Sequence, residues 1–180
     1  TLSLLLSTLP MLGAHKSQST LMQTARPLAY SLLAAVLFSY VLLTYAFEVH
    51  DFSVAYVAKN SNTLLPALYQ ISAVWGAHEG SLLLWVLVLC LWLAAVAYFS
   101  KSLPESVVAR VLSVMGMVAF GFLAFTVFTS NPFERLLPAP LEGHDLNPLL
   151  QDPGLIFHPP LLYVGYVGFS VAFAFAIAAL

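Results

Sequence analysis

The sequence predicts an all-α integral membrane protein, a multi-span helical bundle with proline-rich loops on its outer face. Three observations predict this class. Hydrophobic residues make up 61% of the 180 residues and charged residues only 8%, whereas soluble domains carry about 25% charge. The few charges leave four long uncharged stretches, and most of the prolines gather in one segment. An ordinary soluble domain is therefore excluded.

The charge balance and the cysteine count exclude several classes of partner and site. Six Lys and Arg against eight Asp and Glu give a net charge of −2, which provides no basic field for a phosphate backbone. Cys90 is the single cysteine, so disulfide scaffolds and zinc sites built from cysteines are excluded within this chain. We expect the lipid bilayer as the surroundings of the chain and no nucleic acid among its partners.

Each uncharged stretch is long enough to cross a bilayer, which takes about 20 apolar residues. The chain is therefore predicted to span the membrane at 27–47, 80–100, 111–133 and 159–180. The apolar segment 1–14 is too short to cross, and we interpret it as the end of a truncated span. We accordingly expect residues 1–180 to be part of a larger membrane protein.

The distribution of charges between the spans predicts the orientation. Segments 15–26 and 101–110 hold four of the six bases, whereas segments 48–79 and 134–158 hold seven of the eight acids. Because Lys and Arg are enriched in cytoplasmic loops, the two long segments are expected on the outer face, which is the periplasm in a bacterium. Both outer loops then lie on one side of the membrane and are able to form a small cap.

Local patterns predict the structure within these outer loops. Apolar residues alternate at Phe52, Val54, Tyr56 and Ala58, which favours a short strand. Residues 69–85 favour a helix along the interface that turns inward at two glycines, Gly76 and Gly80. The second loop contains seven prolines between positions 132 and 160, which favour rigid extended turns over regular helix.

His158, in the run DPGLIFHPPLLYVGY, is the first candidate for chemistry. Pro159 disfavours the α region for the residue before it, which predicts that His158 lies just ahead of the last span. There the positive end of a helix dipole favours the neutral imidazole, the form that binds a metal. The alternative is an interfacial histidine that caps the helix or bonds to loop carbonyls.

The remaining histidines carry weaker expectations. His78 and Glu79 form a second candidate at the outer end of a span, although Glu79 suits a carboxylate that interacts with the helix dipole. The pair lacks the HExxH spacing, so a zinc protease is not supported. His50 and His144 are interpreted as solvated loop residues, and His15 is expected on the opposite side of the membrane.

Four segments, in order, carry a resemblance to a known family: VHDFSVAYVAKNSN, VWGAHEGSLLLWVLVL, NPFERLLP and LNPLLQDPGLIFHPPLLYVGYVGFSVAFAFAIAAL. From about Arg26 to Leu180 the sequence resembles the CcmF-type haem lyases of cytochrome c biogenesis, within the haem-handling protein family. The resemblance implies a multi-pass protein of the bacterial inner membrane, or of the mitochondrial inner membrane. It implies that a periplasmic haem chaperone supplies haem, which is attached to the CxxCH thiols of apocytochrome c. Other membrane subunits of cytochrome c maturation are the implied partners.

The same resemblance implies a role for His158. It matches the family's FHPP histidine, one of two outer-face residues proposed to ligate the incoming haem iron. The second histidine, a tryptophan-rich segment and the ligands of a resident b-type haem lie downstream of this motif in the family. The chain is therefore expected to be the N-terminal transmembrane region of the lyase and to lack a complete active site. Arg135, one of only two outer bases, is expected to face a haem propionate.

Two alternatives remain open from the sequence. The first is a paralogous haem lyase dedicated to a nitrite reductase cytochrome, which has a similar N-terminal sequence. The second is a helical subunit with a structural or transport role in a membrane complex. Apart from Cys90, the centres of the predicted spans carry no ionisable residues, which disfavours ion or proton transport.

Overall fold

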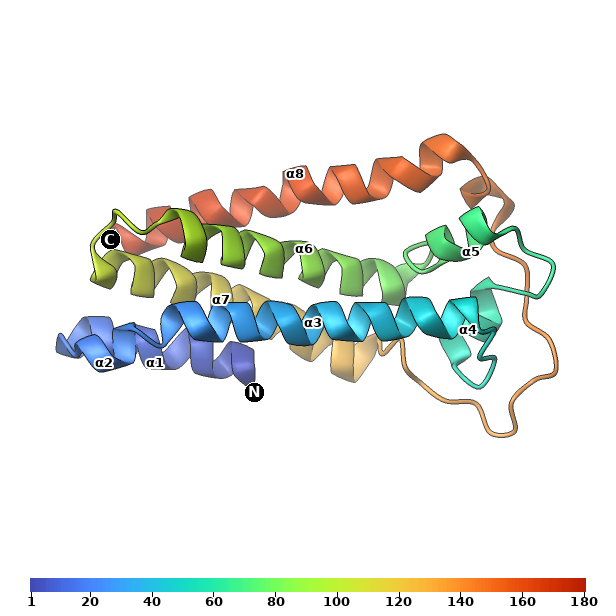
Figure 1. Ribbon diagram of the computed structural model, residues 1–180, viewed down its shortest axis with the longest axis horizontal. Helices are drawn as coiled ribbons and strands as arrows, with labels where there is room; N and C mark the ends of the chain where they lie inside the picture. Colours follow the sequence, from blue (N-terminus) through green and yellow to red (C-terminus); the bar gives the residue numbers. More distant parts are fainter. The chain divides into compact units, whose positions relative to one another are not determined.

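The computed structural model describes residues 1–180, except for the side chain of Leu155, and its regular elements are helices (Figure 1). In chain order they are α1 (Leu2–Lys16), α2 (Ser19–Met22), α3 (Ala25–Glu48), α4 (Ala55–Asn60), α5 (Ala67–Ala73), α6 (His78–Phe99), α7 (Glu105–Thr129), the 3-10 turn η1 (Pro148–Leu150) and α8 (Pro153–Ala178). The predicted all-α class is confirmed.

Four helices are long and apolar enough to cross a membrane. They are Ser19–Glu48, His78–Phe99, Glu105–Thr129 and Ile156–Ala178. Each overlaps one of the four uncharged stretches of the sequence. Acidic residues lie in the first turns of α6 and α7, where they interact favourably with the positive end of the helix dipole.

The chain forms two compact units, and the first comprises residues 1–37, 86–124 and 163–180. Close contacts between helices hold this unit together. A Cβ added to Gly116 of α7 would lie 2.8 Å from Leu6 Cγ of α1, so the two helices approach at a residue without a side chain. Arg26, near the start of α3, donates hydrogen bonds to the carbonyls of Ala97 (3.0 Å) and Ser100 (3.3 Å) at the end of α6 and thereby joins the two helices.

The second unit, residues 38–85 and 125–162, contains both long loops that were predicted on the outer face. We call residues 49–77 and 130–152, which lie between the candidate spans, the cap. Backbone hydrogen bonds join its two segments. The Ala55 amide donates to the Glu134 carbonyl (2.8 Å), and the Leu136 amide donates to the Ser53 carbonyl (2.8 Å). The expected association of the two loops is present in the structure.

The strand predicted around Val54 and Tyr56 is wrong. Within the described residues the only strand-like feature of this segment is one antiparallel bridge between Val54 and Arg135, and the chain then forms helix α4. All residues from 54 to 58 are buried. Because Ala55 and Val57 are apolar too, this is a continuous apolar run, and periodicity alone does not distinguish a buried helix from a strand in such a run.

The predicted start of the last helix is also wrong. Helix α8 begins at Pro153, so His158 is its sixth residue and does not precede it. Asp152 caps the helix, since its Oδ1 accepts from the Gly154 amide (2.8 Å) and its carbonyl accepts from the Ile156 amide (3.1 Å). An Asp at the cap followed by Pro at the first helical position is a favourable start, and it outweighs the local effect of Pro159.

Candidate functional site

The junction between α5 and α6 is organised by one buried hydroxyl group. The helix predicted for 69–85 is interrupted, because α5 ends at Ala73 and α6 begins at His78. Tyr56 Oη accepts from the Ala77 amide (3.2 Å) and lies 3.2 Å from the Val74 carbonyl, to which it donates. Burial raises the pKa of Tyr56 well above its ordinary value, which keeps the hydroxyl protonated as a donor.

Two glycines allow this junction to pack closely, as the sequence predicted for a change of direction. A Cβ added to Gly80 would lie 1.8 Å from the Val74 carbonyl oxygen and 2.6 Å from Tyr56 Oη. A Cβ on Gly76 would lie 3.1 Å from Leu146 Cδ1, which belongs to the proline-rich segment of the cap. The turn between α5 and α6 therefore packs tightly against both segments of the cap.

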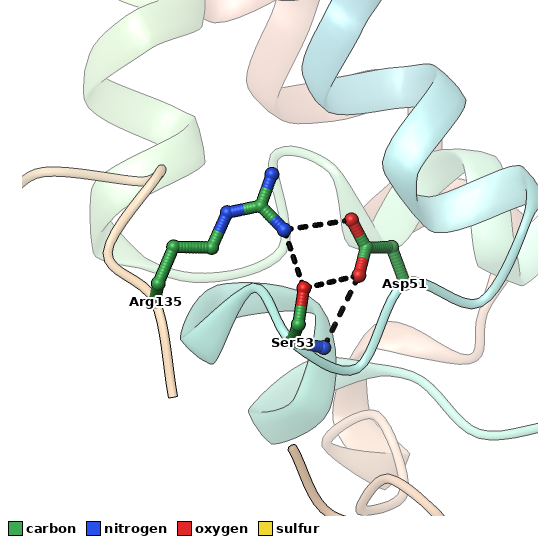
Figure 2. Close-up of polar contacts among 3 residues, drawn as sticks. All are labelled: Asp51, Ser53 and Arg135. Atoms are coloured by element: carbon green, nitrogen blue, oxygen red, sulfur yellow. Dashed lines mark hydrogen bonds and ion pairs between the residues drawn. The ribbon is translucent and has the colours of Figure 1, made fainter. Parts of the chain in front are cut away.

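Arg135 lies at the bridge between the two cap segments (Figure 2). Its Nη1 donates to Asp51 Oδ2 at 2.9 Å and to Ser53 Oγ. The Ser53 hydroxyl also donates to Asp51, and this hydrogen bond, together with Arg135, lowers the pKa of the Asp51 carboxyl. The stabilisation from this pair is consequently fully present above the ordinary pKa of Asp and is lost as the pH falls through the lowered pKa of Asp51 in the folded protein.

The Arg135 guanidinium has capacity for a further acceptor. Figure 2 shows that its contacts with Asp51 and Ser53 use one terminal nitrogen, while the other points away from both. The side chain is 57% exposed. Arg135 was predicted as an outer base that faces a haem propionate, and its pairing with a carboxylate 84 positions away was not predicted.

Further polar contacts tie the cap segments together. Glu142 accepts from the Thr63 hydroxyl (2.7 Å) and from the Thr63 amide (3.1 Å), and these hydrogen bonds lower the pKa of the exposed Glu142 carboxyl. Asn62 donates to Asp145. The His144 amide donates to the Ala58 carbonyl (2.8 Å), and its side chain is exposed.

His158 lies on the second unit's part of α8, and its side chain is exposed. Its neighbours Phe157 and Leu161 are 62% and 71% exposed. Just before it, the indole Nε1 of Trp75 donates to the carbonyl of Ile156 (3.2 Å). The motif WGAHEG is thus joined to Ile156, the residue directly before the motif FHPP, by a hydrogen bond that spacing did not reveal.

The other histidines have different surroundings. The ring of His78 packs edge-on against Phe125, with 6.3 Å between centroids. Glu79 lies in the first turn of α6, in agreement with its interpretation as a dipole partner. His50 Nε2 lies 3.3 Å from Gln70 Nε2, so it is not simply solvated. Among the described side chains no three His, Cys, Asp or Glu form a metal-binding group.

The His158 imidazole is exposed and, among the described side chains, belongs to no group of three His, Cys, Asp or Glu, which matters for the type of cofactor. A zinc centre takes three or four protein ligands, whereas haem iron takes one or two axial ligands because the porphyrin supplies the others. His158, flanked by exposed apolar side chains, suits the second kind of ligand. On the cap, Arg135 has a charged donor available for a carboxylate.

Comparison with known proteins decides the family. The model of the family described as "Cytochrome C assembly protein" matches residues 75–180, a segment that begins at Trp75 and includes both the WGAHEG and FHPP motifs. The chain belongs to this family. The resemblance to proteins of cytochrome c biogenesis is therefore confirmed.

Individual members of the cytochrome C assembly protein family match almost the entire chain. It is 60% identical to the cytochrome c-type biogenesis protein CcmF of Escherichia coli (strain K12), over 99% of this chain and 28% of that protein. It is 62% identical to CcmF of Pseudomonas aeruginosa, over 99% of this chain and 27% of that protein. A solved structure titled "Cytochrome c Heme Lyase CcmF" matches with a TM-score of 0.86 and 32% identity, over 99% of this chain and 28% of that one.

These matches also confirm the type of fold. The matched solved structure covers 99% of this chain, and the four helices of spanning length agree with a membrane protein. The chain spans about 28% of the length of the relatives that it matches.

Proposed function

We propose that this chain is the N-terminal portion of a membrane haem lyase of cytochrome c maturation. The observation that carries the proposal is the placement of His158, the single histidine of the FHPP motif, on an exposed surface of α8 beside apolar neighbours. Membership of the cytochrome C assembly protein family supports it, as does the similarity to a structure titled as a haem lyase.

His158 is proposed as an axial ligand of the incoming haem, which is the substrate. A neutral imidazole is a common haem ligand, and the exposed faces of Phe157 and Leu161 suit contact with an apolar macrocycle. In the reaction each cysteine S–H adds across a haem vinyl group, so that sulfur bonds to one carbon and hydrogen to the other. The contribution of this chain is to hold the haem in place while that addition occurs.

The proposed partners follow from this reaction. A periplasmic haem chaperone supplies haem, an apocytochrome c supplies the CxxCH thiols, and other maturation subunits assemble with the lyase in the inner membrane. The ligands of the resident b-type haem are proposed to lie outside this chain.

The proposed orientation is tested by labelling Lys59, an exposed residue of the cap. With the cap in the periplasm, Lys59 is expected to react with an impermeant amine reagent added to the periplasmic side. Labelling only from the cytoplasmic side would contradict this orientation.

Arg135 is proposed to bind a haem propionate through the part of its guanidinium that Asp51 and Ser53 leave available. Replacing Arg135 with Ala in the full-length protein is expected to reduce haem retention about 10-fold, as for loss of a charge-assisted hydrogen bond of about 1.5 kcal/mol. The measurement is the haem content of the purified protein.

Asp51→Asn provides the matched control for Arg135→Ala. It weakens the same ion pair but keeps the guanidinium, so haem retention is expected to stay near that of the unmodified protein. If both variants lose haem equally, Arg135 acts only by holding the cap together, and its role toward propionate is refuted.

The function itself is tested by depleting the full-length protein in cells that make cytochrome c. Apocytochrome with free thiols is expected to accumulate, and covalent haem staining is expected to disappear. Loss confined to a nitrite reductase cytochrome would support the dedicated paralogue. Normal haem attachment to all cytochromes would overturn the proposal and favour a structural or transport subunit.

A further inference from the structure

Helix α8 has a gap in its hydrogen-bond ladder next to His158. In an α-helix the amide of each residue donates to the carbonyl four positions earlier, so residue 160 would supply the donor for Ile156. Residue 160 is a proline, which has no N–H, and it lies inside α8. The Ile156 carbonyl therefore loses its helical donor, and an unpaired carbonyl in an apolar environment is costly.

Trp75 supplies the missing donor from a distant part of the sequence. Its indole Nε1 donates to the Ile156 carbonyl at 3.2 Å, across 81 positions. The side chain is half-buried, and its own turn is fixed because the Trp75 amide donates to the Ser72 carbonyl (3.2 Å). The next residue, Gly76, packs against Leu146 and Leu150. The donor is thus presented by a well-packed turn of the cap.

We propose that Trp75 is a positioning residue for His158. Its indole N–H replaces the amide that Pro160 lacks and so fixes the turn of α8 that carries His158 against the cap. The consequence for haem rests on the proposed function, whereas the consequence for the order of α8 does not. Removing the indole N–H is expected to loosen this turn and to broaden the range of orientations of the imidazole.

A second tryptophan of the chain provides a built-in comparison. Trp92 Nε1 donates to the Val164 carbonyl at 3.1 Å, also on α8. Residue 168, four positions after Val164, is Gly168, whose amide is available as the ordinary helical donor. Trp92 therefore donates to a carbonyl that already has a backbone donor, whereas Trp75 donates to a carbonyl whose backbone donor is missing.

The first experiment compares Trp75→Phe with Trp92→Phe in the full-length protein, by hydrogen exchange without haem. Both substitutions keep an aromatic ring and delete an indole N–H. Trp75→Phe is expected to speed exchange at the amides of Leu161 and Leu162, which follow the prolines, about 5-fold, the factor for one hydrogen bond of about 1 kcal/mol. Trp92→Phe is expected to change the exchange rates of these two amides by less than about 2-fold. Equal effects of the two variants would overturn the proposal.

The second experiment restores the donor by another route. Pro160→Ala provides an amide at position 160, so the double variant Trp75→Phe with Pro160→Ala is expected to regain the exchange rates of the unmodified protein. Such non-additivity is expected when two changes act on one carbonyl. The proposal is overturned if these amides exchange as fast in the double variant as in Trp75→Phe. It is also overturned if Trp75→Phe impairs folding and the added Pro160→Ala does not restore it. In either case Trp75 acts through packing.

The haem spectrum then separates the positioning role from the ligand role. In haem-loaded full-length protein, Trp75→Phe is expected to lower the fraction of haem with the His158-dependent spectrum, and the double variant is expected to restore it. An unchanged spectrum in His158→Ala would refute the ligand role of His158. The role of Trp75 in ordering α8 would then be tested by the hydrogen-exchange rates alone. A normal spectrum in Trp75→Phe, with His158→Ala altered, would overturn the positioning of His158 by Trp75.

Discussion

Replacing His158 with Ala in the full-length protein is expected to abolish the spectrum of imidazole-ligated incoming haem and to lower the yield of cytochrome c at least about 10-fold. Changes to groups that merely support a metal ligand already cost about 10–100-fold, so loss of the ligand itself belongs at or above this range. The yield is measured by covalent haem staining, and the ligation by the visible spectrum of haem bound to the purified protein.

His144→Ala is the matched control for this prediction. His144 is another exposed histidine of the same unit, and its structural contact is made by the backbone amide, which the substitution keeps. In His144→Ala, the yield of cytochrome c and the spectrum of bound haem are expected to be unchanged. Added imidazole is expected to restore ligation in His158→Ala, which separates loss of the ligand from loss of the fold. Wild-type haem ligation in His158→Ala would contradict the account.

Replacing Gly80 with Ala is expected to have the largest effect on stability. The new Cβ would lie 1.8 Å from the Val74 carbonyl oxygen, so the junction between α5 and α6 must move and the contacts of Tyr56 Oη with it. Overpacking typically costs about 1–3 kcal/mol, and a backbone atom cannot move aside as a side chain does, so a cost of about 3 kcal/mol or more is expected. The loss of stability is measured by unfolding the detergent-solubilised protein with heat or denaturant.

Gly121→Ala provides the matched control on another helix. A Cβ added to Gly121, in α7, meets no atom of the described structure within 4 Å. Because Ala is a better helix former than Gly, stability is expected to stay the same or to rise by up to about 1 kcal/mol. Equal stability of Gly80→Ala and Gly121→Ala would show that the close packing around Tyr56 is not required.

The membrane spans were predictable because they depend on a property that is local in the sequence. Crossing the bilayer excludes charge over a fixed length, so the intervals between Arg26 and Glu48 and between Glu79 and Lys101 were sufficient to locate two helices. The alternation of basic and acidic loops likewise predicted that the two cap segments lie on one side of the membrane. In the structure backbone hydrogen bonds join these two segments.

The errors arose where local rules compete with one another. Pro159 disfavours helical conformation in the residue before it, whereas Asp152 and Pro153 together favour a helix start, and in the structure the start signal prevails. For α4, the alternation of apolar residues favours a strand, whereas the continuous apolar run that contains Ala55 is equally compatible with the buried helix that forms. In both cases the sequence held the relevant signal, and a comparison of the two rules would have found it.

Other features of the site depend on contacts between distant residues. No spacing rule pairs Arg135 with Asp51, or Trp75 with Ile156, because each pair is brought together only when the cap folds. A partial signal existed for Trp75. Pro160 inside a predicted helix implies a carbonyl without its amide donor, and a nearby tryptophan on the same side of the membrane is one of the few groups able to supply an N–H.

The most direct test is a structure of the full-length protein loaded with haem by its chaperone, determined by electron cryomicroscopy. The account predicts that one imidazole nitrogen of His158 coordinates the iron, with the Trp75 indole still bonded to the Ile156 carbonyl. Haem bound elsewhere, with the His158 ring beyond coordination distance of the iron, would contradict it.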